Sequence, residues 1–452
     1  MTAAIHPATA AAEAFWHVTV LSNFARGYDK YSRRYSKASI PESTFPERFF
    51  LLREDELAAG VHKAGGLLRR LGIPGNRLVA LRTEVDAGEL RENIRTGIGR
   101  YVERGWITLS GVAWVGEEGE GGPLEPAVIE EVMAESLRLL HGSLHAFESL
   151  RPRSFSVLPV ARGCQASCPF CFSDASASAE QDQARLNLAR VAEHALQAAE
   201  RGAGRFVITG GGEPGLLRHE VMRELIALGR PLGKTVLITN GHHLARKESA
   251  ARSAMLDDYA RSGLGVLAVS RHHHDDGVST RLMSLETDVR AVAQTWREGR
   301  DHWPALSMRL ICVLQRGGVD NRQTLEDYVS WAAACGIGEI CFKELYVSTS
   351  AESVYHRHAA NAWSHAHQVP LSLVLEFADR HGFTEVSRLP WGSPVFQGEW
   401  RGALLRIAAY TEPSLLWERT HGIARSWNLM ADGRCLVSLE DRGSEIQLAP
   451  AA

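Results

Sequence analysis

Three of the seven cysteines, Cys164, Cys168 and Cys171, fall within eight residues of one another. The odd total makes a disulfide framework a poor explanation in a chain of 452 residues. In a reducing compartment, such clustering indicates thiolates that ligate a metal from one loop. Three thiolates could hold three irons of a 4Fe–4S cube and leave the fourth iron open. Zinc is the alternative, but a closed zinc site needs four ligands, and no second cysteine pair is present.

A charged pair, Lys343 and Glu344, interrupts an otherwise apolar segment at 339–346. Charges in a buried strand are costly unless they face a polar cavity. Because strand side chains alternate, we expect only one of the two to point inward, where either could contact a cofactor or substrate. Arg309, in the preceding apolar segment, could pair with Glu344.

The run His-His-His-Asp-Asp at 272–276 is a second polar cluster. Adjacent histidines on a loop can bind a metal, and Asp275 could polarise one of them. The alternative, which we favour, is a polar loop with one useful residue.

The elements that must position these residues begin at residue 155. Short apolar segments rich in β-branched residues alternate there with amphipathic segments, and the predicted strands are 155–160, 205–209, 235–239, 265–270, 307–314 and 339–346. This rhythm predicts an α/β fold with a parallel sheet, open or curled into a partial barrel. Ligands should bind at the carboxyl ends of the strands, and the cysteine loop directly follows the first strand.

The cysteine loop, Cys164-x3-Cys168-x-Phe170-Cys171, resembles that of the radical S-adenosylmethionine (radical SAM) superfamily, which has an aromatic residue before the third cysteine. Three further segments fall at the expected strand ends: Gly211-Gly212-Glu213-Pro214, Thr239-Asn240-Gly241 and Ser270-Arg271. The resemblance covers roughly residues 153–350. It implies a partial (β/α)6 TIM-like barrel that holds a 4Fe–4S cluster and SAM.

The resemblance also implies roles for individual residues. The cluster would receive one electron and cleave SAM to a 5′-deoxyadenosyl radical, which abstracts hydrogen from the substrate. Cys164, Cys168 and Cys171 would ligate iron. The residues expected to contact SAM are Phe170 by the adenine, Gly211, Gly212 and Glu213 by the amino group, Asn240, and Ser270 and Arg271 by the ribose and carboxylate. An arginine guanidinium suits a carboxylate through paired charge-assisted hydrogen bonds.

The cysteines outside the loop form no motif, so we expect a single cluster. Cys435 could deliver a hydrogen atom to a substrate radical, but a small buried residue in a hairpin explains it better. A G-x-G-x-x-G pattern at 210–215 also follows a strand, as in dinucleotide-binding folds. That fold expects an acidic residue at the end of the next strand, where this chain has Thr239-Asn240-Gly241.

The chain is expected to form three domains, with these motifs in the middle one. Residues 1–125 should form an accessory domain, irregular at first, with a winged-helix-like module at about 50–115 built from helices near 57–71 and 86–101 and a strand at 106–115. Residues 126–350 should form the barrel. Residues 351–452 should form a small α+β cap, in which Asp432-Gly433 indicates a hairpin.

The charge and hydropathy of the chain argue against nucleic acid and membranes as its main partners. The formal net charge of −3, from 50 basic and 53 acidic residues, argues against a protein that wraps nucleic acid over its whole surface. No apolar run approaches the ~20 residues of a membrane span, and the N-terminus lacks a secretion signal. We therefore expect a cytoplasmic protein that does not enter a membrane.

The sequence leaves the substrate open. We expect an enzyme that takes electrons from a donor such as flavodoxin or ferredoxin and acts on a small molecule of natural-product type, because only the barrel mouth and a short cap are available to select it. A ribosomally made peptide held by the N-terminal module is the second alternative. RNA is supported only by a Tyr/Arg-rich arm at 24–37. The non-enzyme alternative is a zinc-stabilised regulator that binds nucleic acid.

Overall fold

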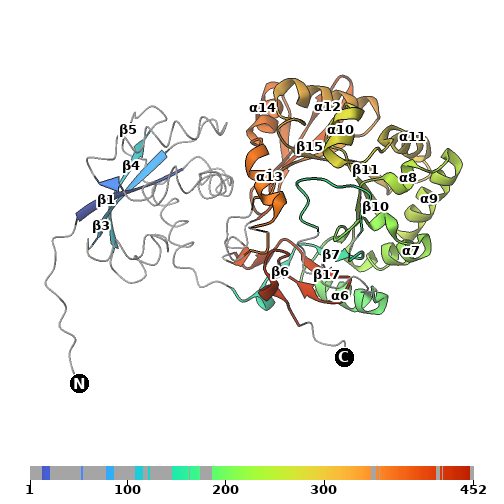
Figure 1. Cartoon of the computed structure of the whole chain (residues 1–452), viewed down its shortest axis with the longest axis horizontal. Coiled ribbons are helices and arrows are strands. Elements are labelled where there is room, and N and C mark those ends of the chain that lie inside the picture. The colour runs from blue at the N-terminus through green and yellow to red at the C-terminus, as the bar shows by residue number, and fades with distance from the viewer. Residues whose placement is uncertain are drawn as a thin grey trace. The chain divides into compact units, whose positions relative to one another are not determined.

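The chain forms two compact units, residues 1–144 and 145–452, in a computed structural model (Figure 1). The structure describes residues 13–20, 52–53, 78–85, 107–115, 121–122, 145–161, 163–173, 186–347, 353–355, 357–413, 418–419 and 421–447. No helix among these residues is long and apolar enough to cross a membrane.

The N-terminal unit contains a five-stranded antiparallel sheet in the order β2-β1-β3-β4-β5. The strands are β1 (Glu13–Val20), β2 (Leu52–Arg53), β3 (Leu78–Val85), β4 (Ile107–Val115) and β5 (Gly121–Gly122). β4 confirms the strand predicted at 106–115. The expectation of an irregular start is wrong for β1, whose aromatic and β-branched residues favour a strand. The sheet also has more strands than the single one expected in the winged-helix-like module. The predicted helices and the arm at 24–37 lie outside the described residues.

The second unit is an α/β fold built on a mostly parallel sheet, as predicted. All six predicted strands are present: β7 (Phe155–Leu158), β8 (Phe206–Ile208), β9 (Thr235–Thr239), β10 (Leu264–Ser270), β11 (Ser307–Leu314) and β12 (Glu339–Glu344). Each pairs in parallel with the next along the chain. The expected partial TIM-like barrel is therefore confirmed.

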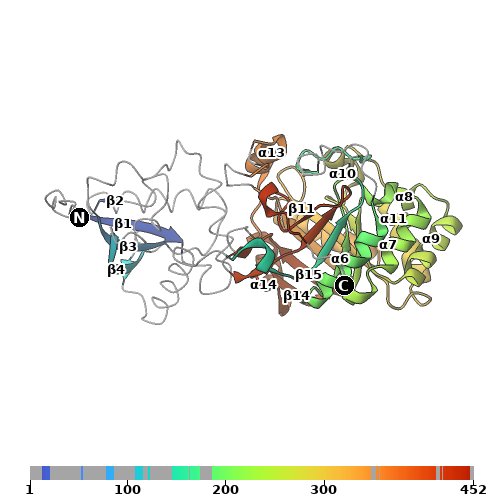
Figure 2. The same cartoon turned by 90° about the horizontal axis from the view of Figure 1, so that it is seen from below.

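Helices cover the outside of the curled sheet (Figure 1), and the same arrangement is seen from below in Figure 2. They are α6 (Leu188–Glu200), α7 (His219–Ala227), α8 (His242–Ala245), α9 (Ser249–Ser262), α10 (Asp276–Met283), α11 (Val289–Gly299), α12 (Arg322–Ala334), α13 (Ala359–His367) and α14 (Ser372–Arg380). Side chains cap several N-termini, because free N–H groups there need acceptors. Asn187 begins α6 in this way, and Asn321 begins α12 with a reciprocal capping box.

The C-terminal hundred residues extend the sheet at both edges. The strands are β13 (Thr384–Arg388), β14 (Pro394–Trp400), β15 (Ala403–Tyr410), β17 (Trp427–Met430) and β18 (Cys435–Leu436). β15 lies parallel to β12, and β17 lies parallel to β7, so eight strands run in parallel. The short strands β6 (Arg151–Pro152) and β16 (Ile423–Ala424) pair separately. The segment expected to be a separate cap thus supplies barrel strands, while the hairpin at Asp432-Gly433 is confirmed as β17–β18. The domain boundaries stay a prediction.

Alternation along the strands gives the sheet an outer face and an inner face. On the outer face, Phe342 of β12 packs against Tyr328 of α12. On the inner face, an apolar cluster of buried and half-buried residues fills the middle of the curled sheet: Val207, Val236, Ile238, Val266, Ala268 and Ile311. Both faces are thus packed, and polar side chains gather near the carboxyl ends of the strands.

Candidate active site

The cysteine loop leaves the end of β7 and carries three free thiols. Cys164 and Cys171 are exposed, and Cys168 is half-buried. The surrounding chain partly desolvates two of them, which raises the pKa of Cys164 and raises that of Cys168 to about 12. Cys171 raises both values further by charge repulsion, so the three sulfurs lie near one another.

The loop after β8 contacts the cysteine loop directly. The N–H of Glu213 donates to the carbonyl of Gly163 over 2.8 Å. Gly211 has a φ of +122°, which favours glycine. A side chain at Gly212 would meet the Gly163 carbonyl oxygen at 2.3 Å, so only glycine fits there. On the other side, the N–H of Ser167 donates to the carbonyl of Met283 at the end of α10.

The carboxylate of Glu213 is buried and accepts three hydrogen bonds. Its Oε1 accepts from the N–H of Gly215 at 2.7 Å and from the hydroxyl of Thr239 at 2.5 Å. Its Oε2 accepts from the N–H of Asn240 at 2.8 Å. Burial raises the pKa of Glu213, and the three hydrogen bonds act in the opposite direction because they favour the charged form. Glu213 therefore fastens the loop after β8 to the end of β9.

Asn240 extends this connection to the cysteine loop. Its Nδ2 lies 3.2 Å from Oε1 of Gln165 and 3.7 Å from Sγ of Cys164. The sequence placed Asn240 near SAM, and the structure brings it next to a cysteine sulfur as well.

Ser270 and Arg271 end β10 but point to opposite faces. Arg271 is buried on the outer face, where it donates to the carbonyls of His273 and His274, pairs with Asp276 and lies over the ring of Trp331. These contacts commit its guanidinium to the start of α10 and to α12. The expectation that Arg271 binds the SAM carboxylate is therefore corrected, because the alternation of β10 turns its side chain outward. Ser270 is half-buried on the inner face.

The polar run at 272–276 builds structure. The Nδ1 of His272 accepts from the N–H of Val313 at 3.1 Å, and Asp275 caps the start of α10. Burial lowers the pKa of His272 to about 3, so the ring is neutral. Its ring lies edge-on to that of Phe170, with centroids 5.1 Å apart. Over the part of the chain that the structure describes, no three His, Cys, Asp or Glu side chains converge on a single metal ion.

The strand pair Lys343 and Glu344 divides as alternation predicts. Lys343 pairs with Glu412 and lies 5.8 Å from the ring centre of Tyr410. Glu344 is buried and accepts from the hydroxyl of Thr411. Since Phe342 lies on the outer face, Lys343 is the inward member of the pair.

Arg309 makes a different ion pair from the one expected. It donates through Nε and Nη2 to one oxygen of Glu339, at 2.9 and 2.6 Å. The predicted partner, Glu344, is at the other end of β12 from Glu339 and lies on the opposite face of the strand. The expected pairing of Arg309 with Glu344 is therefore wrong.

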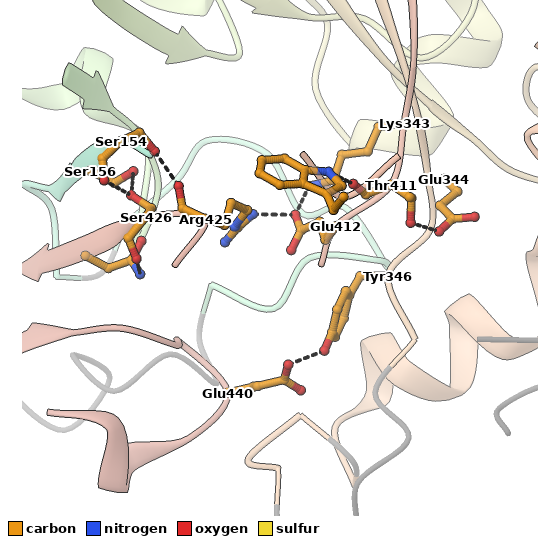
Figure 3. Close-up of polar contacts among 12 residues, drawn as sticks. Ser154, Ser156, Lys343, Glu344, Tyr346, Thr411, Glu412, Arg425, Ser426 and Glu440 are labelled. Carbon is orange, nitrogen blue, oxygen red and sulfur yellow. Dashed lines mark hydrogen bonds and ion pairs between the residues drawn. The ribbon is translucent and has the colours of Figure 1, made fainter. Parts of the chain in front are cut away.

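Sequence reasoning missed a polar cluster between the two edge strands of the barrel (Figure 3). Glu412, just after β15, pairs with Lys343 and also with Arg425, just before β17, at 2.9 Å. Glu418 accepts from the backbone N–H of Arg425. This Lys–Glu–Arg bridge joins the paired strands β12 and β15 to β17, which pairs with neither of them. β15 was not predicted as a strand, and β17 was predicted only as one arm of the hairpin at Asp432-Gly433, so no signal placed these charges together.

An aromatic cluster packs on the cysteine loop, and sequence analysis did not find it. Phe172, next to Cys171, contacts the rings of Tyr346, Tyr355 and His358 at centroid distances of 5.9, 4.5 and 5.6 Å. The hydroxyl of Tyr346 donates to Glu440 (Figure 3). The end of the cysteine loop thus packs against aromatic side chains from residues 346–358.

Cys435 lies in β18 and is buried beside α6. Burial raises the pKa of its thiol to about 12, and Arg190 of α6 is the nearest charge that opposes this. Asn428 and Glu445 also lie close enough to affect this pKa. These contacts favour the packing explanation over a hydrogen-atom donor.

Comparison with known proteins identifies the middle of the chain. The family model described as the radical SAM superfamily matches residues 158–314, a range that contains all three loop cysteines, Glu213 and Asn240. Residues 158–314 are a radical SAM domain. No curated protein matches the chain. The radical SAM domain identifies the protein as an enzyme of the radical SAM type, whose cofactors are a 4Fe–4S cluster and SAM.

Solved structures match the chain at low similarity. SuiB of Streptococcus suis bound to its precursor peptide SuiA is 14% identical, with 78% of this chain and 72% of SuiB covered and a TM-score of 0.42. SuiB bound to S-adenosylmethionine is 15% identical, with 73% and 80% covered and a TM-score of 0.42. HemN of Escherichia coli is 16% identical, with 56% of each chain covered and a TM-score of 0.34. At these scores the likeness carries no argument about the substrate.

The residues of the radical SAM domain fit its cluster. The loop thiols are free, near one another and reachable from solvent, yet they do not converge on one ion. In a 4Fe–4S cube each of the three cysteines would bind a different iron.

Proposed function

We propose that this enzyme abstracts hydrogen from an organic substrate held at the mouth of the barrel. When bound together, the cluster and SAM supply a 5′-deoxyadenosyl radical for that step. The observation that carries the proposal is the attachment of the cysteine loop to the Gly-Gly-Glu loop through Gly163, Gly212 and Glu213. That attachment brings the three thiols and the proposed SAM-binding loop to one end of the sheet.

The protein's own residues would do four things at this site. Cys164, Cys168 and Cys171 would ligate three irons. Gly211, with its φ of +122°, and Gly212, which packs against Gly163, shape the loop that would receive the amino group of SAM. Phe170, held by His272, would lie against an apolar or aromatic part of SAM. Ser270, on the inner face, offers a hydroxyl to the same ligand.

A small molecule of natural-product type is the substrate class we propose. The supporting observation is the bridge of Lys343, Glu412 and Arg425, which lies inside the sheet near the carboxyl ends of β12 and β15. Such a concentration of hydrogen-bonding groups suits a compact polar molecule better than an apolar one.

A ribosomally made peptide is the second candidate, and β1 favours it. Its eight residues pair with β3 on one side, but only Phe15 and Trp16 pair with β2 on the other. In the residues that the structure describes, the rest of that edge has no ladder, and extended peptides bind such edges by adding a strand. The electron donor we propose is a flavodoxin or ferredoxin, and the proposed compartment is the cytoplasm.

The test is turnover by anaerobically reconstituted protein with SAM and a chemical reductant. We expect 5′-deoxyadenosine to form slowly alone and faster with the true substrate. Producer-cell extract, divided by ultrafiltration into fractions below and above about 1 kDa, separates the two substrate classes. Stimulation by the low-mass fraction supports the small molecule, and stimulation only by a protease-sensitive fraction supports the peptide. No 5′-deoxyadenosine under any condition would refute the proposal.

A further inference from the structure

The side-chain amide of Asn240 is placed between two acceptors of the cysteine loop. Its Nδ2 lies 3.7 Å from Sγ of Cys164 and 3.2 Å from Oε1 of Gln165. An Asn amide has two N–H donors, so each acceptor can take one. The N···S distance is normal for a hydrogen bond to the large sulfur atom.

Other hydrogen bonds fix the orientation of this amide. The Oδ1 of Asn240 accepts from the N–H of His242 at 2.9 Å, so the NH2 group must face the cysteine loop. The backbone N–H of Asn240 donates to Glu213, and only 5% of the residue is exposed. Hydrogen bonds thus fix both the backbone and the side-chain oxygen of Asn240, and they orient its NH2 group toward the sulfur.

Cys164 is the thiol best supplied with donors in this arrangement. Its Sγ also accepts from the N–H of Ala166 at 3.3 Å, a bond made within the loop itself. The bond from Asn240 comes from a different strand end, 76 residues further along the chain. It therefore couples the sulfur to the rigid sheet, whereas the bond from Ala166 moves with the loop.

Hydrogen bonds to a cluster sulfur stabilise its negative charge. Reduction adds an electron to the cluster, so the reduced form gains more from such a bond than the oxidised form does. We propose that Asn240 is a positioning residue whose amide donates to the iron-ligating thiolate of Cys164 and raises the reduction potential of the cluster. This inference rests on the proposed function only through the assignment of Cys164 as an iron ligand.

The experiment is a redox titration of the reconstituted cluster without SAM, followed by electron paramagnetic resonance. Asn240→Leu keeps the size of the side chain and removes both donors. Its equilibrium constant for one-electron reduction should fall about tenfold, which corresponds to about 59 mV. Gln165→Leu is the matched control, because it removes the other acceptor and leaves the bond to sulfur. Its potential should equal that of the wild type.

A second variant covers poor folding of the first. Asn240→Ser retains an oxygen that can accept from the N–H of His242, but it is too short to reach the sulfur. It should show the same fall in reduction equilibrium constant. Wild-type potentials in whichever variants bind iron would overturn the inference while the proposed function stands. Wild-type protein without a cluster would instead overturn the proposed function.

Discussion

The carboxylate of Glu213 accepts a 2.8 Å hydrogen bond from the backbone N–H of Asn240. This bond joins the loops that follow β8 and β9, two neighbouring parallel strands. The N–H of Glu213 meanwhile donates to Gly163 in the third loop. One buried residue therefore holds together the three loops that carry the candidate cofactor site.

Removal of this carboxylate should destabilise the barrel unit. Glu213→Ala leaves buried donors of Gly215, Thr239 and Asn240 without their acceptor, and we expect the free energy of unfolding to fall by about 3 kcal/mol. Glu213→Gln keeps one acceptor oxygen and should cost less. Urea unfolding of the metal-free protein measures both. Equal stability of Glu213→Ala and the wild type would show that these bonds are unimportant.

A methyl group at Gly212 should disrupt the cysteine loop. Its Cβ would lie 2.3 Å from the carbonyl oxygen of Gly163, a contact that only a backbone shift relieves. We expect Gly212→Ala to lower stability by about 2 kcal/mol and to lose iron on gel filtration. Gly204→Ala is the control, because nothing lies within 4 Å of its added Cβ. Iron retention by Gly212→Ala equal to that of the control would contradict this account.

The sequence predicted the barrel core well because its signals are local. The strand from Thr235 to Thr239 and that from Ser307 to Leu314 have the predicted bounds, since each is a short apolar run between turn signals. The cysteine loop and the Gly-Gly-Glu loop were also found from neighbouring residues alone.

The failures came from pairings between distant segments. β15 and β17 join opposite edges of the sheet, and nothing near Ala403 or Trp427 shows which strand each will pair with. The bridge of Glu412 and Arg425 depends on both strands and was therefore missed. Arg271 was misplaced for a different reason: its motif was found, but a one-residue step along β10 decides which face it takes.

The Lys343–Glu412–Arg425 bridge should stabilise the barrel unit, because it connects β15 and β17, which do not pair with each other. Glu412→Gln removes the negative charge shared by Lys343 and Arg425, and we expect a loss of about 1–2 kcal/mol in unfolding free energy. Replacement of Lys343 by Met in the same protein should restore part of it, because one uncompensated cation is removed.

An exposed ion pair gives the matched control for the bridge. Asp301, which is 94% exposed beside Arg300, should tolerate Asp301→Asn within about 0.5 kcal/mol. If Glu412→Gln is no more destabilising than Asp301→Asn, the bridge does not hold the edges of the barrel.

Acid should weaken the fold through His272. Burial lowers the pKa of this residue from 6.5 to about 3, so between these values the unfolded chain binds a proton that the folded chain does not. Its contribution is therefore constant above about pH 6.5 and falls as the pH drops toward 3. At pH 5 the loss should be about 2 kcal/mol.

The variant His272→Gln isolates this contribution. Gln retains an oxygen that can accept from the N–H of Val313 but does not titrate. Unfolding free energies at pH 7 and pH 5 should differ less in the variant than in the wild type. The same difference in both proteins would assign the acid sensitivity to other groups.

The central claim is that Cys164, Cys168 and Cys171 hold a cluster with one iron open to SAM. The most direct measurement is the iron and sulfide content of anaerobically reconstituted protein, together with its electron paramagnetic resonance spectrum before and after SAM is added. The account predicts about four irons per chain and a spectrum that SAM changes, with both lost when any of the three becomes Ala but kept in Cys435→Ser. Full iron content in a loop-cysteine variant, or a spectrum that SAM leaves unaltered, would contradict it.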